Sequence, residues 1–187
     1  MRALRRALCA ALGGALLPFC AAAQPPQNNL PQLTREGWGF SCHVRKDEPD
    51  THDACGRVGP LYLGMNRADA EKVLGSPTTA ESLGSSILYI YALQMDETKH
   101  MITYAVIGYD SKRCASSIQL TGVPWSGAWA FDDIKLGDSG KAIIARLGNP
   151  HGVSPSRQEG SIVWDYLPWT FSLEIRGSVV SSIRVSD

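Results

Sequence analysis

A fifteen-residue pattern occurs twice in this chain, once at 63–77 and again at 136–150. Both copies begin with Leu-Gly and end with Leu-Gly-x-Pro, and their matching glycine, leucine and proline positions lie 73 residues apart. A pattern that returns in register, without a gap, indicates two copies of one supersecondary unit. The chain is therefore expected to fold as two related units in tandem.

Each copy carries the signals that begin and end a short helix. Asn66 is expected to cap the first helix, and Asp138 or Ser139 the second. Gly75 and Gly148, each followed two residues later by proline, are expected to end the helices. The side chains expected on the apolar helix faces are Ala70, Val73 and Leu74 in the first copy and Ile143, Ile144 and Leu147 in the second.

Apolar and polar residues alternate along the segments that follow each helix. In the second copy Ile162, Trp164 and Tyr166 are expected to face inward, and this period of two is typical of an antiparallel sheet with one buried and one wet face. The polar residues expected on the outer face are Asp165, Ser172, Glu174, Arg176, Ser182 and Arg184. The fold class is therefore predicted to be α+β: two tandem units, each a short helical segment packed on an antiparallel β-sheet.

The first copy differs from the second on its outer face. There the alternation leaves the apolar residues Leu88, Ile90 and Ala92 pointing outward. An apolar outer face needs a cover, which would be the second unit, the N-terminal arm or a partner protein.

The first 23 residues have the features of a secretory signal peptide. Three arginines precede an apolar stretch and a run of alanines, so cleavage is expected near Ala23. Cys20 suggests a lipoprotein signal as the alternative, but Phe19 is bulkier than the small residue that such a signal requires before its cysteine. The predicted location is periplasmic or secreted, with an outer-membrane lipoprotein lipidated at Cys20 as the less favoured alternative.

The rest of the chain divides into four segments by composition and repeat boundaries. They are an N-terminal arm with a stapled loop (24–59), repeat 1 (60–121), a junction (122–131) and repeat 2 (132–187). Removal of the three leader arginines leaves fifteen basic residues against eighteen acidic ones, with no basic stripe. This composition argues against nucleic-acid binding and against binding to an anionic membrane.

Three cysteines, Cys42, Cys55 and Cys114, follow the signal peptide, and export would place them where thiols pair by default. Cys42 and Cys55 bracket a short polar loop, and a disulfide that closes it would add about 3 kcal/mol of stability. With His43 and His52 the same segment offers four zinc ligands, although oxidised thiols cannot bind a metal. Pairing of Cys55 with Cys114 is also permitted by the count; otherwise Cys114 is the unpaired thiol.

Several motifs together resemble a known family. The segment Leu63-Gly64-Met65-Asn66, the Gly-x-Pro helix ends, the Trp164-Asp165-Tyr166 strand and a closing Ile-x-Val strand resemble the SmpA/OmlA domain of small outer-membrane assembly lipoproteins. Two such units in an exported chain are similar to the β-lactamase-inhibitor-protein-like (BLIP-like) superfamily. The resemblance implies two units side by side that present a concave sheet face, which clasps an enzyme in the inhibitors and joins an assembly complex in the lipoproteins.

No pattern of catalytic residues stands out. Cys114 lies in a polar turn without an evident base, the four histidines are scattered, and the Asp132-Asp133 pair is interpreted as a turn or solvated face. The chain is therefore predicted not to be an enzyme and to use no cofactor or metal.

The predicted function is that of an exported module that binds another protein, with inhibition of a hydrolase or toxin as its most specific form. The alternative is a structural accessory subunit of cell-envelope assembly, and a small enzyme ranks third. Trp125 and Trp129 are aromatic residues in the junction and suit either a hydrophobic plug or a binding anchor. The predicted binding residues are Trp125, Trp129, His43, Arg45, Asp47, Leu88 and Ile90.

Overall fold

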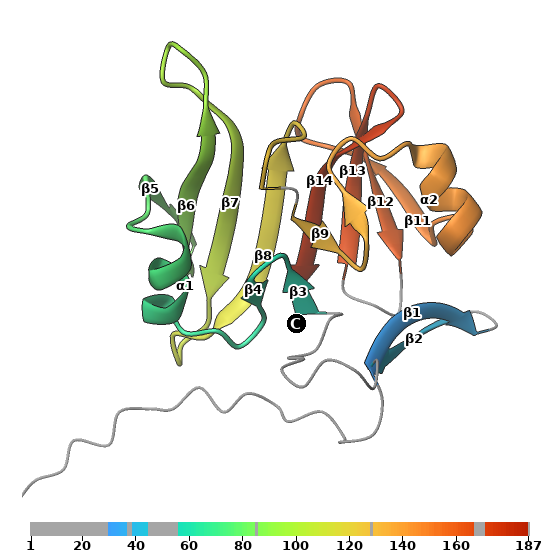
Figure 1. The fold of residues 1–187 in the computed structure, drawn as a ribbon, viewed down its shortest axis with the longest axis horizontal. Helices are drawn as coiled ribbons and strands as arrows, with labels where there is room; N and C mark the ends of the chain where they lie inside the picture. The colour runs from blue at the N-terminus through green and yellow to red at the C-terminus, as the bar shows by residue number, and fades with distance from the viewer. Residues whose placement is uncertain are drawn as a thin grey trace, which may run out of the picture.

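The computed structural model describes residues 30–36, 39–44, 56–84, 86–127, 129–166 and 171–186 of the chain. The protein is mostly β-sheet with two short helices, which agrees with the predicted α+β class. Strands β1 (Leu30–Glu36) and β2 (Gly39–Val44) form a separate two-stranded antiparallel sheet (Figure 1).

The remaining elements follow one order twice: a small hairpin, a helix and four strands. The first half, residues 57–122, contains β3 (Arg57–Val58), β4 (Leu61–Tyr62), α1 (Arg67–Leu74), β5 (Thr79–Leu83), β6 (Ser86–Met95), β7 (Met101–Tyr109) and β8 (Ala115–Gly122). The second half, residues 130–186, contains β9 (Ala130–Phe131), β10 (Ile134–Lys135), α2 (Gly140–Leu147), β11 (Gly152–Pro155), β12 (Ser161–Tyr166), β13 (Phe171–Arg176) and β14 (Val179–Ser186). The two helices begin 73 residues apart, the spacing of the sequence pattern.

The four long strands of each half join in one antiparallel sheet of eight strands, in the order β11-β12-β13-β14-β8-β7-β6-β5. The sequence predicted one sheet for each unit, whereas β8 and β14 pair and make the sheet continuous. Their registers match, because Ile118 and Leu120 of β8 lie opposite Val185 and Ile183 of β14 and all four side chains are buried. This pairing removes two sheet edges that would otherwise expose unpaired backbone groups.

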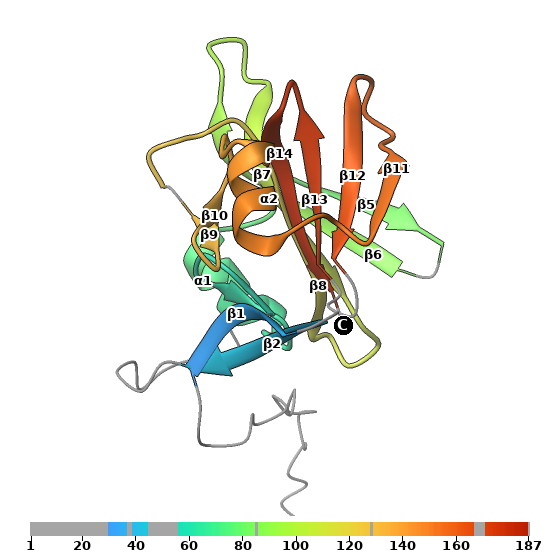
Figure 2. The same ribbon diagram turned by 90° about the vertical axis from the view of Figure 1, so that its right-hand side faces the viewer.

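The hydrophobic core lies between the sheet and the helices. Both helices and the β9–β10 hairpin lie on the same side of the sheet (Figure 2). Phe131 of β9 packs against Phe171 of β13, which in turn stacks on Tyr166, with ring centroids 4.9 and 5.0 Å apart. Leu120 and Leu173 are fully buried in the same cluster, so one core serves both halves.

The predicted helix ends are confirmed. The Asn66 side chain accepts a hydrogen bond from the Asp69 amide at 2.9 Å, and the Ser139 hydroxyl accepts one from the Ala142 amide at 3.1 Å. Gly75 and Gly148 follow the helices with positive φ angles of 76° and 79°. The side chains of Asn66 and Ser139 thus each satisfy one of the free backbone amides in the first turn of a helix.

The predicted helix faces are partly wrong. Ala70, Ile143 and Leu147 are buried as expected, but Val73 and Ile144 are 47% and 37% exposed. An eight-residue helix that lies along a sheet buries only a narrow stripe, so the side chain next to the stripe stays in water.

Ile162 of β12 was also expected inside and is 40% exposed, near the β11 edge of the sheet. Trp164 and Tyr166, the other inward residues predicted for this strand, are buried. Neither described helix has the length and apolar character needed to cross a membrane.

Candidate functional site

The face of the sheet opposite the helices is called the open face. Within the described ranges, no helix covers it (Figure 2). Strand pairing places its central residues in two parallel rows that run across the sheet. One row is Ile90, Val106, Gln119, Arg184, Ser172 and Asp165, and the other is Ala92, Tyr104, Thr121, Ser182 and Glu174.

The part of the open face on β6 and β7 is apolar. Leu88, Ile90 and Ala92 of β6 and Val106 of β7 are partly exposed on it, and Tyr104 adds an aromatic ring. The sequence predicted Leu88 and Ile90 in this place, and their outward orientation follows from the inward position of Tyr91, which is 1% exposed. Alternation therefore identified one strand of this surface correctly.

The middle of the open face is a hydrogen-bonded polar cluster that joins β8 to β14. The Gln119 amide nitrogen Nε2 donates to Thr121 Oγ1 at 3.1 Å and to Ser182 Oγ at 3.0 Å. The Thr121 and Ser182 hydroxyls are also hydrogen-bonded to each other, at 2.9 Å. Because Thr121 and Ser182 are 4% and 1% exposed, this cluster, here called the seam, satisfies polar groups that would be costly to bury alone.

Next to the seam, on the second half, lies Glu174. The Ser156 hydroxyl donates to its Oε1 at 2.6 Å. Burial raises the pKa of the Tyr104 phenol, and the negative charge of Glu174 adds to this effect. Tyr104 therefore stays protonated at neutral pH and presents a hydroxyl that can donate a hydrogen bond at the edge of the apolar area.

Arg184 is an exposed cation near the centre of the open face. It lies on β14, between Gln119 of β8 and Ser172 of β13. Among the described residues, no carboxylate oxygen lies within the 4.0 Å that defines an ion pair with it. Its guanidinium is consequently available to a partner.

Sequence reasoning did not select Tyr104, Val106 and Gln119 as site residues. Strand β7 has apolar or small side chains on both faces, with Ala105 and Ile107 buried behind Tyr104 and Val106. Period-two alternation therefore does not distinguish the inward side chains of β7 from the outward ones. The signal that could have found these residues is the pairing of β7 with β6, which extends the Leu88–Ile90 surface to the next strand.

The predicted anchors Trp125 and Trp129 lie away from the open face. Their rings meet edge to face, with centroids 5.6 Å apart, and both pack against the core. Trp129 also lies on Gly59 in the β3–β4 turn, where a Cβ atom on residue 59 would be only 2.5 Å from the Trp129 Cγ atom. This packing matches the hydrophobic-plug alternative, and the binding role of the two tryptophans stays a prediction.

The other predicted contacts are only partly covered by the described residues. His43 and Cys42 lie in β2, whose backbone alone is described. Arg45, Asp47 and Cys55 lie outside the described residues. Cys114 is buried and disulfide-bonded, which decides between the paired and unpaired states that the sequence left open for it. The Cys42–Cys55 bridge stays a prediction. A disulfide between Cys114 and either Cys42 or Cys55 would exclude this bridge, because each cysteine forms only one disulfide.

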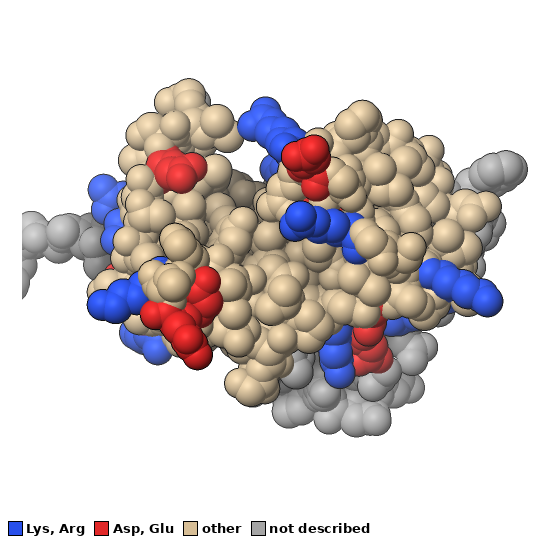
Figure 3. Space-filling view, turned by 90° about the horizontal axis from the view of Figure 1, so that it is seen from above, with Lys and Arg blue, Asp and Glu red and all other residues tan. Residues whose placement is uncertain are grey.

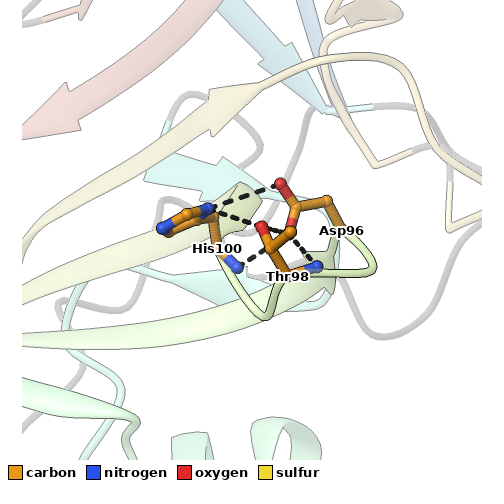
Figure 4. Close-up of polar contacts among 3 residues, drawn as sticks. All are labelled: Asp96, Thr98 and His100. Carbon is orange, nitrogen blue, oxygen red and sulfur yellow. Dashed lines mark hydrogen bonds and ion pairs between the residues drawn. The ribbon is translucent and has the colours of Figure 1, made fainter.

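A polar cluster at the β6–β7 turn contains Asp96, Thr98 and His100 (Figure 4). Asp96 Oδ1 accepts from the Thr98 hydroxyl at 2.7 Å and from the Thr98 and His100 amides at 2.9 Å, and these bonds lower the pKa of the Asp96 carboxyl. The Thr98 hydroxyl and the Asp96 carboxylate both approach the same His100 nitrogen, Nδ1. A catalytic relay needs one partner on each ring nitrogen, so the cluster is interpreted as a turn-forming network.

A second cluster attaches α1 to the sheet. The Arg67 guanidinium lies 4.2 Å from the centre of the Tyr89 ring and pairs with Glu71 at 2.6 Å. Tyr109 meets Tyr89 edge to face, and burial raises the pKa of the Tyr109 and Tyr91 phenols. All of these groups lie on the helix side and are used in packing.

Carboxylate pairs do not assemble into a metal or acid–base site within the described residues. Asp132 and Asp133 form the β9–β10 turn with φ angles of 45° and 66°. The Asp132 carboxylate forms an ion pair with the guanidinium of Arg146 in α2, at 2.6 Å. In the part of the chain that is described, no three potential metal ligands come together. Charged side chains of both signs are interspersed on the face seen in Figure 3, without a large patch of one sign.

Comparisons with known proteins give distant likenesses in fold. No protein-family model and no curated protein matches the chain significantly. Among solved structures, YjgB of Bacillus subtilis, a DUF4309 family protein, is 14% identical with a TM-score of 0.47, and the match covers 68% of this chain and 82% of that one.

Two further solved structures are more remote. An extracellular protein of Bacillus anthracis that contains an SCP domain is 11% identical with a TM-score of 0.43; the match covers 77% of this chain and half of that protein. A candidate beta-lactamase inhibitor protein from Streptococcus mutans is 18% identical with a TM-score of 0.26, over 64% of this chain and 80% of that one. No residue role is transferred from proteins with identities this low.

Proposed function

We propose that the protein is an exported binding module that contacts another protein through the open face. The observation that carries this proposal is the composition of that face: an apolar area on β6 and β7 lies beside a tyrosine, a fixed polar seam and an arginine that has no ion pair among the described residues. Both described helices lie on the other side of the sheet and leave this area uncovered (Figure 2). A partner that covers it would remove apolar surface from water, which is the main favourable term in association.

The chemistry of the open face suits protein recognition better than catalysis. Tyrosine and arginine are enriched among the residues that contribute most to protein interfaces. The seam fixes Gln119, so this side chain loses little conformational freedom on binding. The two clusters of titratable groups found elsewhere each stabilise a turn or a helix.

Inhibition of a hydrolase or toxin is the specific form of binding that we favour, because a rigid eight-stranded sheet can present a fixed surface to an enzyme. The alternative, a structural subunit of cell-envelope assembly, uses the same face with a different partner. Trp125, Trp129 and the segment with His43, Arg45 and Asp47 are proposed as secondary contacts.

The proposal can be tested with a photo-crosslinking amino acid at position 106, on the open face, and at position 73, on exposed α1. Mature protein would be mixed with envelope extract, and crosslinked partners would be identified by mass spectrometry and purified. We expect one partner at position 106 that is absent at position 73. A hydrolase or toxin that loses activity in a stoichiometric mixture supports inhibition, and components of a membrane complex support the assembly role.

Matched charge substitutions then test the face directly. Val106→Lys places a charge in the apolar area, whereas Val73→Lys changes an exposed valine on the helix side. Val106→Lys should weaken the complex by at least about tenfold, because an unpaired charge would be buried at the interface. Equal affinities of the two variants, both shown to be folded by circular dichroism, would refute the open face as the binding site.

A further inference from the structure

We infer that Arg184 selects a partner whose contact surface carries a carboxylate next to apolar side chains. This inference rests on the proposed function of the open face. It adds the chemistry of the partner, which neither the fold nor the apolar area alone defines.

The first step is the position of Arg184. It lies in the row Ile90, Val106, Gln119, Arg184 and Ser172, near the middle of the sheet. Neighbouring strands are about 4.8 Å apart, so Arg184 lies about 10 Å from Val106 and about 14 Å from Ile90 along this row. A partner that covers the apolar area would therefore also reach Arg184.

The second step is the absence of an internal partner for this charge. Two other arginines, Arg67 and Arg146, have carboxylates at 2.6 Å, whereas Arg184 has no ion pair among the described residues. Its cross-strand neighbours, Gln119 and Ser172, are uncharged. Covering Arg184 with an apolar or basic surface would leave a buried charge without a partner, which is strongly unfavourable.

The third step concerns the anions of the same face. Glu174 accepts a hydrogen bond from Ser156 and is partly buried, and Asp165 lies on β12, two strands from Arg184. Glu81 lies on β5, opposite Leu88 and four strands from Arg184. None of these carboxylates is within ion-pair distance of Arg184. The guanidinium can form a bidentate pair with a carboxylate, so an acidic side chain of the partner is the group that satisfies it.

The experiment uses the intact mature protein and two immobilised synthetic peptides. One repeats Ser-Asp-Ser-Ile four times, and the other has Lys in place of Asp. In an extended chain this repeat places each acidic group about 7 Å from the nearest isoleucines on the same side and about 20 Å from the next, which brackets the distances on the open face. Surface plasmon resonance should show about tenfold stronger binding to the acidic peptide, and 0.5 M NaCl should weaken that binding.

Two arginine variants make the test specific. Arg184→Glu should reverse the preference between the peptides, and Arg113→Glu, at an exposed arginine in the β7–β8 turn, should leave it unchanged. Equal binding of both peptides, binding of neither, or an unchanged preference in Arg184→Glu would overturn the inference. Binding to phosphatidylglycerol vesicles in preference to the acidic peptide would also overturn it.

The two proposals fail in different ways. If Val106→Lys abolishes binding of the crosslinked partner but Arg184→Glu and salt have no effect, the open face binds a protein and only the carboxylate requirement is wrong. If no partner crosslinks at position 106, the proposed function itself is wrong.

Discussion

Gly59 and Trp129 offer a direct test of whether this tryptophan is a packing element or a free binding anchor. Gly59 has a φ angle of 58°, and a Cβ atom added there would be 2.5 Å from the Trp129 Cγ atom. Gly177, in the β13–β14 turn, has a φ angle of 57°, but a Cβ atom there meets no atom within 4 Å. The substitutions Gly59→Ala and Gly177→Ala therefore impose similar backbone strain and differ in contact with the indole.

The magnitude follows from these two contributions. An alanine in the left-handed region costs about 1–2 kcal/mol, which is the whole expected effect of Gly177→Ala. Overpacking against a fixed side chain adds about 1–3 kcal/mol, so Gly59→Ala should reduce the free energy of unfolding by about 2–5 kcal/mol. Pro60 follows Gly59 and restricts it further, which makes a single comparison insufficient.

A double-mutant cycle with Trp129→Gly removes that complication. Unfolding in guanidinium chloride would be measured for the wild type, Gly59→Ala, Trp129→Gly and the double variant. The coupling between the two positions should be about 1–3 kcal/mol, because Trp129→Gly removes the Cβ, Cγ and Cδ2 atoms that lie 2.5–2.8 Å from the new methyl group. A coupling of zero would mean that Trp129 moves aside without cost, and the interpretation of Trp129 as a packed plug would be refuted.

Three further predictions concern the seam, a helix cap and the β6–β7 turn. Ser182→Val should cost about 1–3 kcal/mol in denaturant unfolding, because it leaves buried hydrogen-bond partners unsatisfied; a neutral effect would mean that the seam contributes nothing to stability. Ser139→Ala should cost about 1 kcal/mol and Ser139→Asn much less; equal losses would argue against capping. The pKa of Asp96 is lowered, so its contribution to stability is present above the ordinary value of 3.8 and is lost as the pH falls through the lower folded value. An NMR titration of the Asp96 carboxyl should have its midpoint below 3.8, and Thr98→Ala should raise that midpoint, whereas an unchanged midpoint would contradict the role of the threonine.

Local features of the fold could be predicted from the sequence. The caps at Asn66 and Ser139 depend on residues three positions apart, and the burial of Trp164 and Leu173 follows from alternation within single strands. The pairing of β8 with β14 could not be predicted. It is non-local, and the same alternating pattern would suit an edge strand or a partner molecule equally well.

The candidate site was predictable only where one strand contained the signal. Leu88 and Ile90 break the expected polar exterior and were found for that reason. Gln119 and Ser182 belong to different halves, and only the register of β8 and β14 brings them within 3.0 Å. Arg184 was expected on the outer face, but its lack of an ion pair depends on which side chains the neighbouring strands place beside it.

The pairing of β8 with β14 also determines when this protein can complete its fold during synthesis. Strand β8 closes the first half in sequence, but its second neighbour appears only after a hairpin, a helix and three more strands have been made. Until then the first half has an unpaired edge at β8, and a nascent chain that stops before residue 179 has a second one at β13. Such edges invite pairing with other chains. Strand β14 is thus the strand that covers the exposed edges of both halves, and synthesis of the chain must pass residue 179 before either edge is paired.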